Sequence, residues 1–166
     1  MPDRKTMERA AADKREGKAP TTQAGEFVRE EIHHIREGKH GARSTKQAIA
    51  IGLSKARRAG VKLPAPKKGT VSEETRKSAA RETAAGARGA KPASPRRSRA
   101  ITAALKREGH TAASKGALAR QAKSAARKRT AGARSAAARK AVKTKGPALR
   151  SAAARKAART RARSTG

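Results

Sequence analysis

The chain contains no cysteine, tryptophan or tyrosine, and Phe27 is its only aromatic residue. The absence of cysteine excludes disulfides, zinc sites built on thiolates, and cysteine nucleophiles. The scarcity of aromatic rings removes the platforms on which single-strand binders and RNA-recognition sheets stack bases. What remains open is binding to the backbone of duplex DNA or to the shape of structured RNA.

Large apolar side chains are also scarce, since 15 of the 166 residues are Val, Ile, Leu or Phe. A fraction below ~20% combined with high net charge is the compositional signature of disorder. Burial of Ala removes little surface, whereas ordering the backbone costs ~1–2 kcal/mol per residue. We therefore expect a mostly α chain with extensive disorder, in which a small helical hairpin is followed by an Ala/Lys/Arg-rich tail with transient helices.

Acidic residues almost disappear from the second half of the chain. The whole sequence has 44 Lys and Arg against 12 Asp and Glu, which gives a formal net charge of +32. Residues 91–166 hold 23 of the cations and a single acid, Glu108. A segment of this kind repels itself and favours a polyanionic partner. A solvated tail that only aids solubility is the alternative.

The apolar residues that are present concentrate in residues 27–63, which hold nine of the 15. Val28, Ile32 and Ile35 are spaced by four and three residues and therefore share one face of a helix. This pattern predicts a helix over about residues 22–38.

A second helix is predicted after a glycine-containing loop. Ser44 and Gln47 form an S-x-x-Q capping box, and Gly60 suits the position after the last turn. Two helices joined in this way are typical of a helical hairpin. The core that we predict for this hairpin consists of Val28, Ile32, Ile35, Ile49, Leu53 and Leu63, with Phe27 beside it.

Composition divides the chain into four segments: a polar N-terminal segment with a short helix, the α-helical hairpin module, a short helix with a linker, and a basic low-complexity tail. Their predicted bounds are 1–20, 21–64, 65–95 and 96–166. The short helix is expected to start from a capping box at Thr70 and Glu73.

Two internal repeats are visible. In the tail, residues 134–141 recur as residues 150–157, which gives a period of 16 residues. A weaker echo links residues 36–40 with residues 107–110, because Arg-Glu-Gly occurs in both and a histidine follows. Chance is the alternative for this echo, given the biased composition.

The cations of the tail are the candidate nucleic-acid contacts. Phosphate would neutralise them and remove the repulsion that opposes helix formation. Residues 94–97, Ser-Pro-Arg-Arg, resemble the Ser-Pro-basic-basic turns of linker-histone tails, although an ordinary linker turn is the alternative. The predicted phosphate contacts are Arg96, Arg97, Lys123, Arg127, Lys128, Arg129, Arg139, Lys140, Arg155, Lys156 and Arg159. Four hairpin residues are further candidates, with a solvated charged face as the alternative: Lys46, Lys55, Arg57 and Arg58.

Residues with metal-binding side chains gather only around His33, His34 and His40, with Glu30, Glu31 and Glu37 nearby. Zinc needs three or four converging ligands. Adjacent histidines on a helix point about 100° apart, and His40 falls in the loop, so we predict no metal site and no cofactor. Without a nucleotide-binding glycine loop or a core large enough to enclose a pocket, we also predict no catalytic residues and no enzymatic activity.

Two stretches of the hairpin resemble a known family. They are EFVREEIHH, which starts at Glu26 and continues through REGKHG, and KQAIAIGLSKARRAG, which starts at Lys46. Over about residues 20–68 these stretches are similar to a family of small, very basic bacterial proteins of unknown function. The resemblance implies a bacterial source and carries no activity or site residues. The tail resembles linker-histone tails and bacterial histone-like proteins in composition.

Charge and resemblance together predict a non-enzymatic, sequence-tolerant, histone-like DNA-binding protein of the bacterial nucleoid. An RNA-associated or ribosome-associated protein is one alternative. A protein–protein adaptor that uses residues 22–60 is another. No apolar run approaches ~18 residues, so we expect a cytoplasmic location, no leader peptide and no membrane partner.

Overall fold

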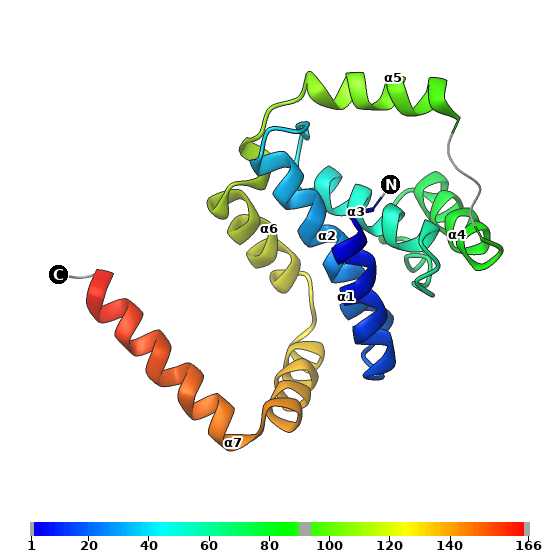
Figure 1. Ribbon diagram of the computed structural model, residues 1–166. Helices are drawn as coiled ribbons and strands as arrows, with labels where there is room; N and C mark the ends of the chain where they lie inside the picture. Colours follow the sequence, from blue (N-terminus) through cyan, green and yellow to red (C-terminus); the bar gives the residue numbers. More distant parts are fainter. Residues whose placement is uncertain (1, 90–93, 165–166) are drawn as a thin grey trace. The chain divides into compact units, whose positions relative to one another are not determined.

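The computed structural model describes residues 2–89 and 94–164, and these residues form helices joined by turns and loops, of which the connection over residues 59–72 is long (Figure 1). The helices are α1 (Arg4–Arg15), α2 (Pro20–Arg36), α3 (Thr45–Arg58), α4 (Glu73–Ala87), α5 (Pro95–Lys106), the 3-10 helix η1 (Thr111–Ala113), α6 (Lys115–Arg127) and α7 (Ala131–Ser164). Contacts divide the chain into two units, Met1–Gln121 and Ala122–Gly166. Each unit is described by itself below.

In the first unit, α2 and α3 form the predicted hairpin. The Ser44 hydroxyl accepts a hydrogen bond from the Gln47 N–H at 3.2 Å, and the Gln47 side chain accepts one from the Arg43 N–H at 2.8 Å. Gly38 and Gly60 follow the two helices with φ of 74° and 88°, a conformation that glycine adopts at little cost. The two hairpin helices and the cap at Ser44 are confirmed.

Helices α2 and α3 approach closely because α3 presents small residues to its neighbour. Thr45, Ala48, Gly52 and Ala56 are spaced by three, four and four residues, and all four are buried. A Cβ atom added to Gly52 would lie 2.6 Å from the Cα atom of Val28. Small side chains on α3 therefore replace the large apolar ones that a wider core would need.

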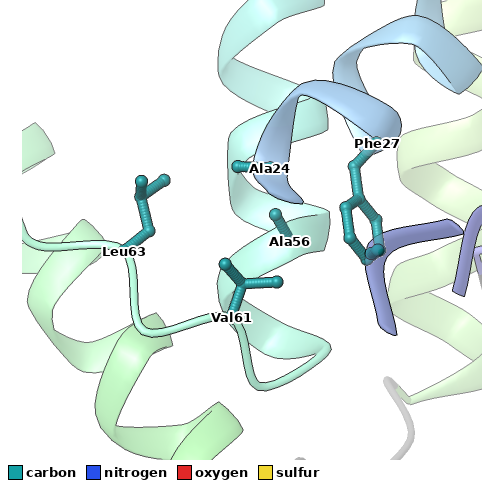
Figure 2. Packing of buried hydrophobic residues seen from close by; sticks show 6 residues of the cluster. Ala24, Phe27, Ala56, Val61 and Leu63 are labelled. Atoms are coloured by element: carbon teal, nitrogen blue, oxygen red, sulfur yellow. The ribbon is translucent and has the colours of Figure 1, made fainter. Parts of the chain in front are cut away.

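One end of the hairpin packs around Phe27, which the sequence placed only beside the core (Figure 2). Its ring is 1% exposed and shares a cluster with side chains from α1, α2, α3 and the segment after α3. The buried members of this cluster are Ala10, Ala24, Phe27, Ala56, Val61 and Leu63. Helix α1 therefore belongs to the core of this unit, where Thr6 and Ala10 are buried.

The other end of the hairpin is closed by η1 and the residues around it. Ile32, Ile35, Ala42 and Ala48 form a second buried cluster with the adjacent alanines 112 and 113. The Thr45 hydroxyl donates to the Ala112 carbonyl at 2.6 Å, and the Arg36 Nε donates to the Ala113 carbonyl at 2.8 Å.

The loop that follows the first copy of the Arg-Glu-Gly echo lies against the second copy. The Gly41 N–H donates to the Leu105 carbonyl at 2.9 Å, and the Ala42 N–H donates to the Gly109 carbonyl at 3.0 Å. A Cβ atom on Gly41 would come within 1.8 Å of the Glu108 carbonyl oxygen. Position 41 therefore requires glycine, because any side chain there would collide with the backbone of Glu108.

Helix α4 covers the far side of α3. The Ser54 hydroxyl donates to Glu82 at 2.5 Å, and the Thr83 hydroxyl donates to the Leu63 carbonyl at 3.0 Å. The expected capping box at Thr70 and Glu73 is wrong, because the Ser72 hydroxyl accepts from the Thr75 N–H instead.

The expectation of extensive disorder with a tail of transient helices is wrong, and with it the description of the chain as intrinsically disordered. Residues 94–164 form α5, η1, α6 and α7. Alanine is the best helix former, and Lys and Arg follow closely, while a helix satisfies most of its own backbone groups without a core. Buried apolar area alone predicts disorder here, whereas helix propensity and hydrogen bonds within each helix favour order.

The predicted turn at residues 94–97 is instead the start of a helix. Ser94 is the N-cap of α5 and Pro95 is its first residue, a position where the missing N–H of proline costs nothing. The predicted hairpin core is only partly right, because Ile49 is half-buried while Phe27 is fully enclosed.

In the second unit, α7 consists of two helical stretches that meet at Gly146, which has φ 64° and ψ 170° (Figure 1). The first stretch carries residues 134–141, and the second carries residues 150–157. The 16-residue repeat therefore corresponds to two helical stretches of related sequence on either side of Gly146 and Pro147.

Candidate nucleic-acid interface

The predicted phosphate contacts all lie on exposed positions of helices or of the turn between them. In the first unit, Arg96 and Arg97 occupy the first turn of α5. In the second unit, Lys123 and Arg127 lie on α6, and Lys128 and Arg129 lie in the turn that follows it. The remaining predicted contacts lie on α7: Arg139, Lys140, Arg155, Lys156 and Arg159.

Helix α7 carries its cations on all sides instead of along one stripe. Successive residues of a helix are rotated by about 100°, so Arg134, Arg139 and Lys140 point in three separate directions. No acid lies in this helix, because Glu108 is the only Asp or Glu after residue 90. The cations of α7 can therefore meet phosphates from any direction, and no single face is built for reading base edges.

The four hairpin candidates have different surroundings. Lys46 and Arg58 are exposed on α3. Lys55 Nζ lies 2.6 Å from Glu31 Oε2 and 3.4 Å from Glu30 Oε1, and Arg57 is 7% exposed. Lys55 and Arg57 therefore serve the interior, and we leave them out of the contacts proposed below.

Glu30 and Glu31 are the functional-type residues that sequence reasoning missed. The sequence presents both only as neighbours of the histidines, whereas in the structure Glu30 is 4% exposed and Glu31 is 0% exposed. A signal was present in the spacing, since Ala24, Phe27, Glu31 and Ile35 follow one another at intervals of three, four and four residues. This stripe, and not the one through Val28, is the most deeply buried side of α2.

The side chains of His34 and His40 lie close to that of Glu31. His40 Nε2 lies 3.2 Å from Glu31 Oε1, and the rings of His34 and His40 are 6.2 Å apart at an interplanar angle of 84°. One ligand atom from each of the three residues falls within 4.8 Å of the others. His33, in contrast, is exposed on the neighbouring face of α2.

Residues 17–68 match the model of a family of unknown function, DUF6496. The resemblance expected for about residues 20–68 is confirmed to this extent. The match covers α2, α3 and their connection, so it includes the hairpin, the small-residue side of α3 and the Glu31 cluster. The resemblance of the tail to histone-like proteins stays an expectation.

Comparison with curated proteins and with solved structures gives no match. Among the described helices, none is both long enough and apolar enough to cross a membrane.

Proposed function

We propose that the chain is a non-enzymatic, sequence-tolerant nucleic-acid binder of the nucleoid, that duplex DNA is its main partner, and that exposed cations of α5, α6 and α7 contact phosphates. The observation that carries the proposal is the exposure of all eleven predicted contacts in a region whose only acid is Glu108. Because this region of the sequence has one acid, its cations far outnumber the acids that could neutralise them, and phosphate is the abundant polyanion that can do so.

The distribution of cations around α7 favours contact with the phosphate backbone of DNA over readout of base edges. Base-specific recognition uses a few side chains positioned on a rigid element in the major groove. The cations of α7 surround the helix, which suits contact with phosphates of either strand. The scarcity of aromatic rings disfavours single strands as the preferred partner.

The adaptor alternative loses the feature on which it depended. Val28, Ile32, Ile35 and Leu53 belong to or pack against the two buried clusters of the first unit. They are therefore not free to form an apolar docking face, and we do not pursue the adaptor.

The test measures fluorescence anisotropy of two unrelated 30-bp duplexes at salt concentrations from about 50 to 200 mM. We expect equal affinity for both duplexes, and a loss of roughly 10³–10⁵ in affinity over this range if ~6–10 phosphates are contacted. The quadruple variant Lys128→Gln, Arg139→Gln, Arg155→Gln and Lys156→Gln should reduce the slope of log K against log salt by about 0.9 per lost phosphate contact.

A matched control removes the same number of Lys and Arg charges from exposed positions elsewhere: Lys5→Gln, Lys14→Gln, Arg15→Gln and Arg43→Gln. This control should change the slope much less than the α6–α7 variant. Equal losses in both variants, or tight binding to one duplex that survives high salt, would contradict the proposal. Stronger displacement by structured RNA than by duplex DNA would transfer the function to RNA.

A further inference from the structure

Among the described residues, the buried acids around Glu31 carry more negative charge than the cations in contact with them balance. Glu30 and Glu31 are both buried, and the cation that contacts them is Lys55, at 3.4 and 2.6 Å. One negative charge is left over in the buried part, and Asp3 adds another at the rim, 3.3 Å from His34 Nε2. An uncompensated buried charge is costly, so this imbalance needs an explanation in a chain of net charge +32.

The orientation of His40 places a second acceptor atom beside Glu31. Its Nδ1 donates a hydrogen bond to the Gly41 carbonyl at 3.1 Å. In the neutral ring, Nε2 then carries a lone pair, and this lone pair lies 3.2 Å from Glu31 Oε1, which is also an acceptor. Neither Glu31 oxygen has a hydrogen bond of good geometry. These two atoms need either a hydrogen between them, on the ring or on the carboxyl group, or a metal ion that binds both.

The dimensions suit a metal ion. Zinc binds histidine nitrogen at about 2.0–2.1 Å and carboxylate oxygen at about 2.0–2.2 Å in a tetrahedral arrangement, so two of its ligands lie about 3.4 Å apart. The 3.2 Å between His40 Nε2 and Glu31 Oε1 is close to this separation. The ligand atoms of Glu31, His34 and His40 already lie within 4.8 Å of one another. Small side-chain shifts would bring them to one ion. The Nδ1 bond of His40 to a carbonyl is also the second contact that metal-binding histidines usually make.

We propose that Glu31, His34 and His40 bind one divalent transition-metal ion, for which Zn²⁺ is the natural probe. Asp3 and Glu30 form a second group with His34, in which one ligand atom from each residue also falls within 4.8 Å of the others. The ion ties α2 to the glycine loop that precedes α3. None of the proposed phosphate contacts belongs to this cluster, so the metal site stands or falls independently of nucleic-acid binding.

The test uses the full chain without an affinity tag and free of nucleic acid. Zn²⁺ binding is measured by competition with a chromophoric chelator, and coordination is followed by the visible absorption of Co²⁺. We expect one equivalent bound, and a loss of at least tenfold in affinity for His40→Ala and for His34→Ala. Circular dichroism of each variant establishes that the helices are retained.

The chain offers a matched control one residue away. His33→Ala removes an exposed histidine from the same helix and should leave the affinity for Zn²⁺ unchanged. Equal binding by the wild-type chain and the His34→Ala/His40→Ala double variant would overturn the proposal. So would a loss in His33→Ala as large as in His40→Ala. Either result would show that Glu31, His34 and His40 do not hold the ion.

Discussion

The Cα atom of Val28 occupies the space that a side chain on Gly52 would need, because a Cβ atom added there would lie 2.6 Å away from it. This contact sets the distance between α2 and α3. Both clusters of buried residues include side chains from these two helices. The spacing at Gly52 therefore affects the packing at both ends of the hairpin.

Gly52→Ala should lower the free energy of unfolding by about 1–3 kcal/mol, because overpacking forces the backbone of α2 away from α3. Chemical denaturation followed by circular dichroism measures this change. The control is Gly25→Ala on α2, where an added Cβ would meet nothing within 4 Å. Gly25→Ala should raise stability by about 0.4–1 kcal/mol, and a similar effect of both substitutions would refute the close approach.

Gly41→Ala should detach the segment around η1 from the hairpin, because its Cβ would come within 1.8 Å of the Glu108 carbonyl oxygen. Amide hydrogen exchange by NMR should show faster exchange at Ala42, whose N–H donates to the Gly109 carbonyl. Amides in the middle of α3 should keep their protection.

Gly109→Ala is the matched control for this contact. Gly109 takes part in the same backbone pairing, but an added Cβ there would meet nothing within 4 Å. Unchanged exchange at Ala42 is expected for this variant. Slow exchange at Ala42 in Gly41→Ala would show that Gly41 does not lie against the backbone of Glu108.

Gly146→Ala combined with Pro147→Ala should join the two stretches of α7 into one straight helix. Alanine disfavours the φ of 64° at Gly146, and it restores the N–H that proline lacks. Because the chain has no cysteine, cysteines introduced at positions 138 and 154 of the same chain can each carry one spin label. The distance between the labels should lengthen toward the about 24 Å that 16 helical residues span. An unchanged distance would place the cause of the bend elsewhere.

Lys39→Gln should raise the pKa of Glu37, because a hydrogen bond from the Lys39 ammonium holds the pKa of that carboxyl below its ordinary value of 4.5. A carboxyl with a lowered pKa in the folded chain stabilises it above the ordinary pKa, and this contribution is lost as pH falls. Since Glu37 is exposed, the contribution is small. Carbon-13 NMR titration of the Glu37 carboxyl measures the shift, and Lys46→Gln should leave it unchanged.

Local patterns in the sequence predicted the local structure. The spacing of Val28, Ile32 and Ile35 and the cap at Ser44 were enough to find α2 and α3, because capping and amphipathic periodicity act within a few residues. The helices of the tail were not predicted from its low apolar content, because the helix propensity of alanine acts without buried apolar area.

The tail cations and the cluster around Glu31 differ in how far the sequence could predict them. Exposure of the tail cations follows from composition, since no acid besides Glu108 lies near them in sequence. The meeting of Glu31 with His40 depends on a loop whose path is set by distant contacts, with Leu105 and Gly109 accepting from its backbone. Only the stripe through Phe27, Glu31 and Ile35 hinted at a buried carboxylate.

The pairing of Gly41 and Ala42 with Leu105 and Gly109 closes a long stretch of chain on itself. Between the contact of α4 with α3 and the contact of Gly109 with Ala42, α5 is a bridge without buried residues. A single backbone cut within this bridge, for example after Arg99, would leave both ends attached to the same body through Ala112, Ala113 and Gly86. The protein can thus be severed there into two polypeptides that remain one particle, which makes α5 a natural place to split it for fragment complementation.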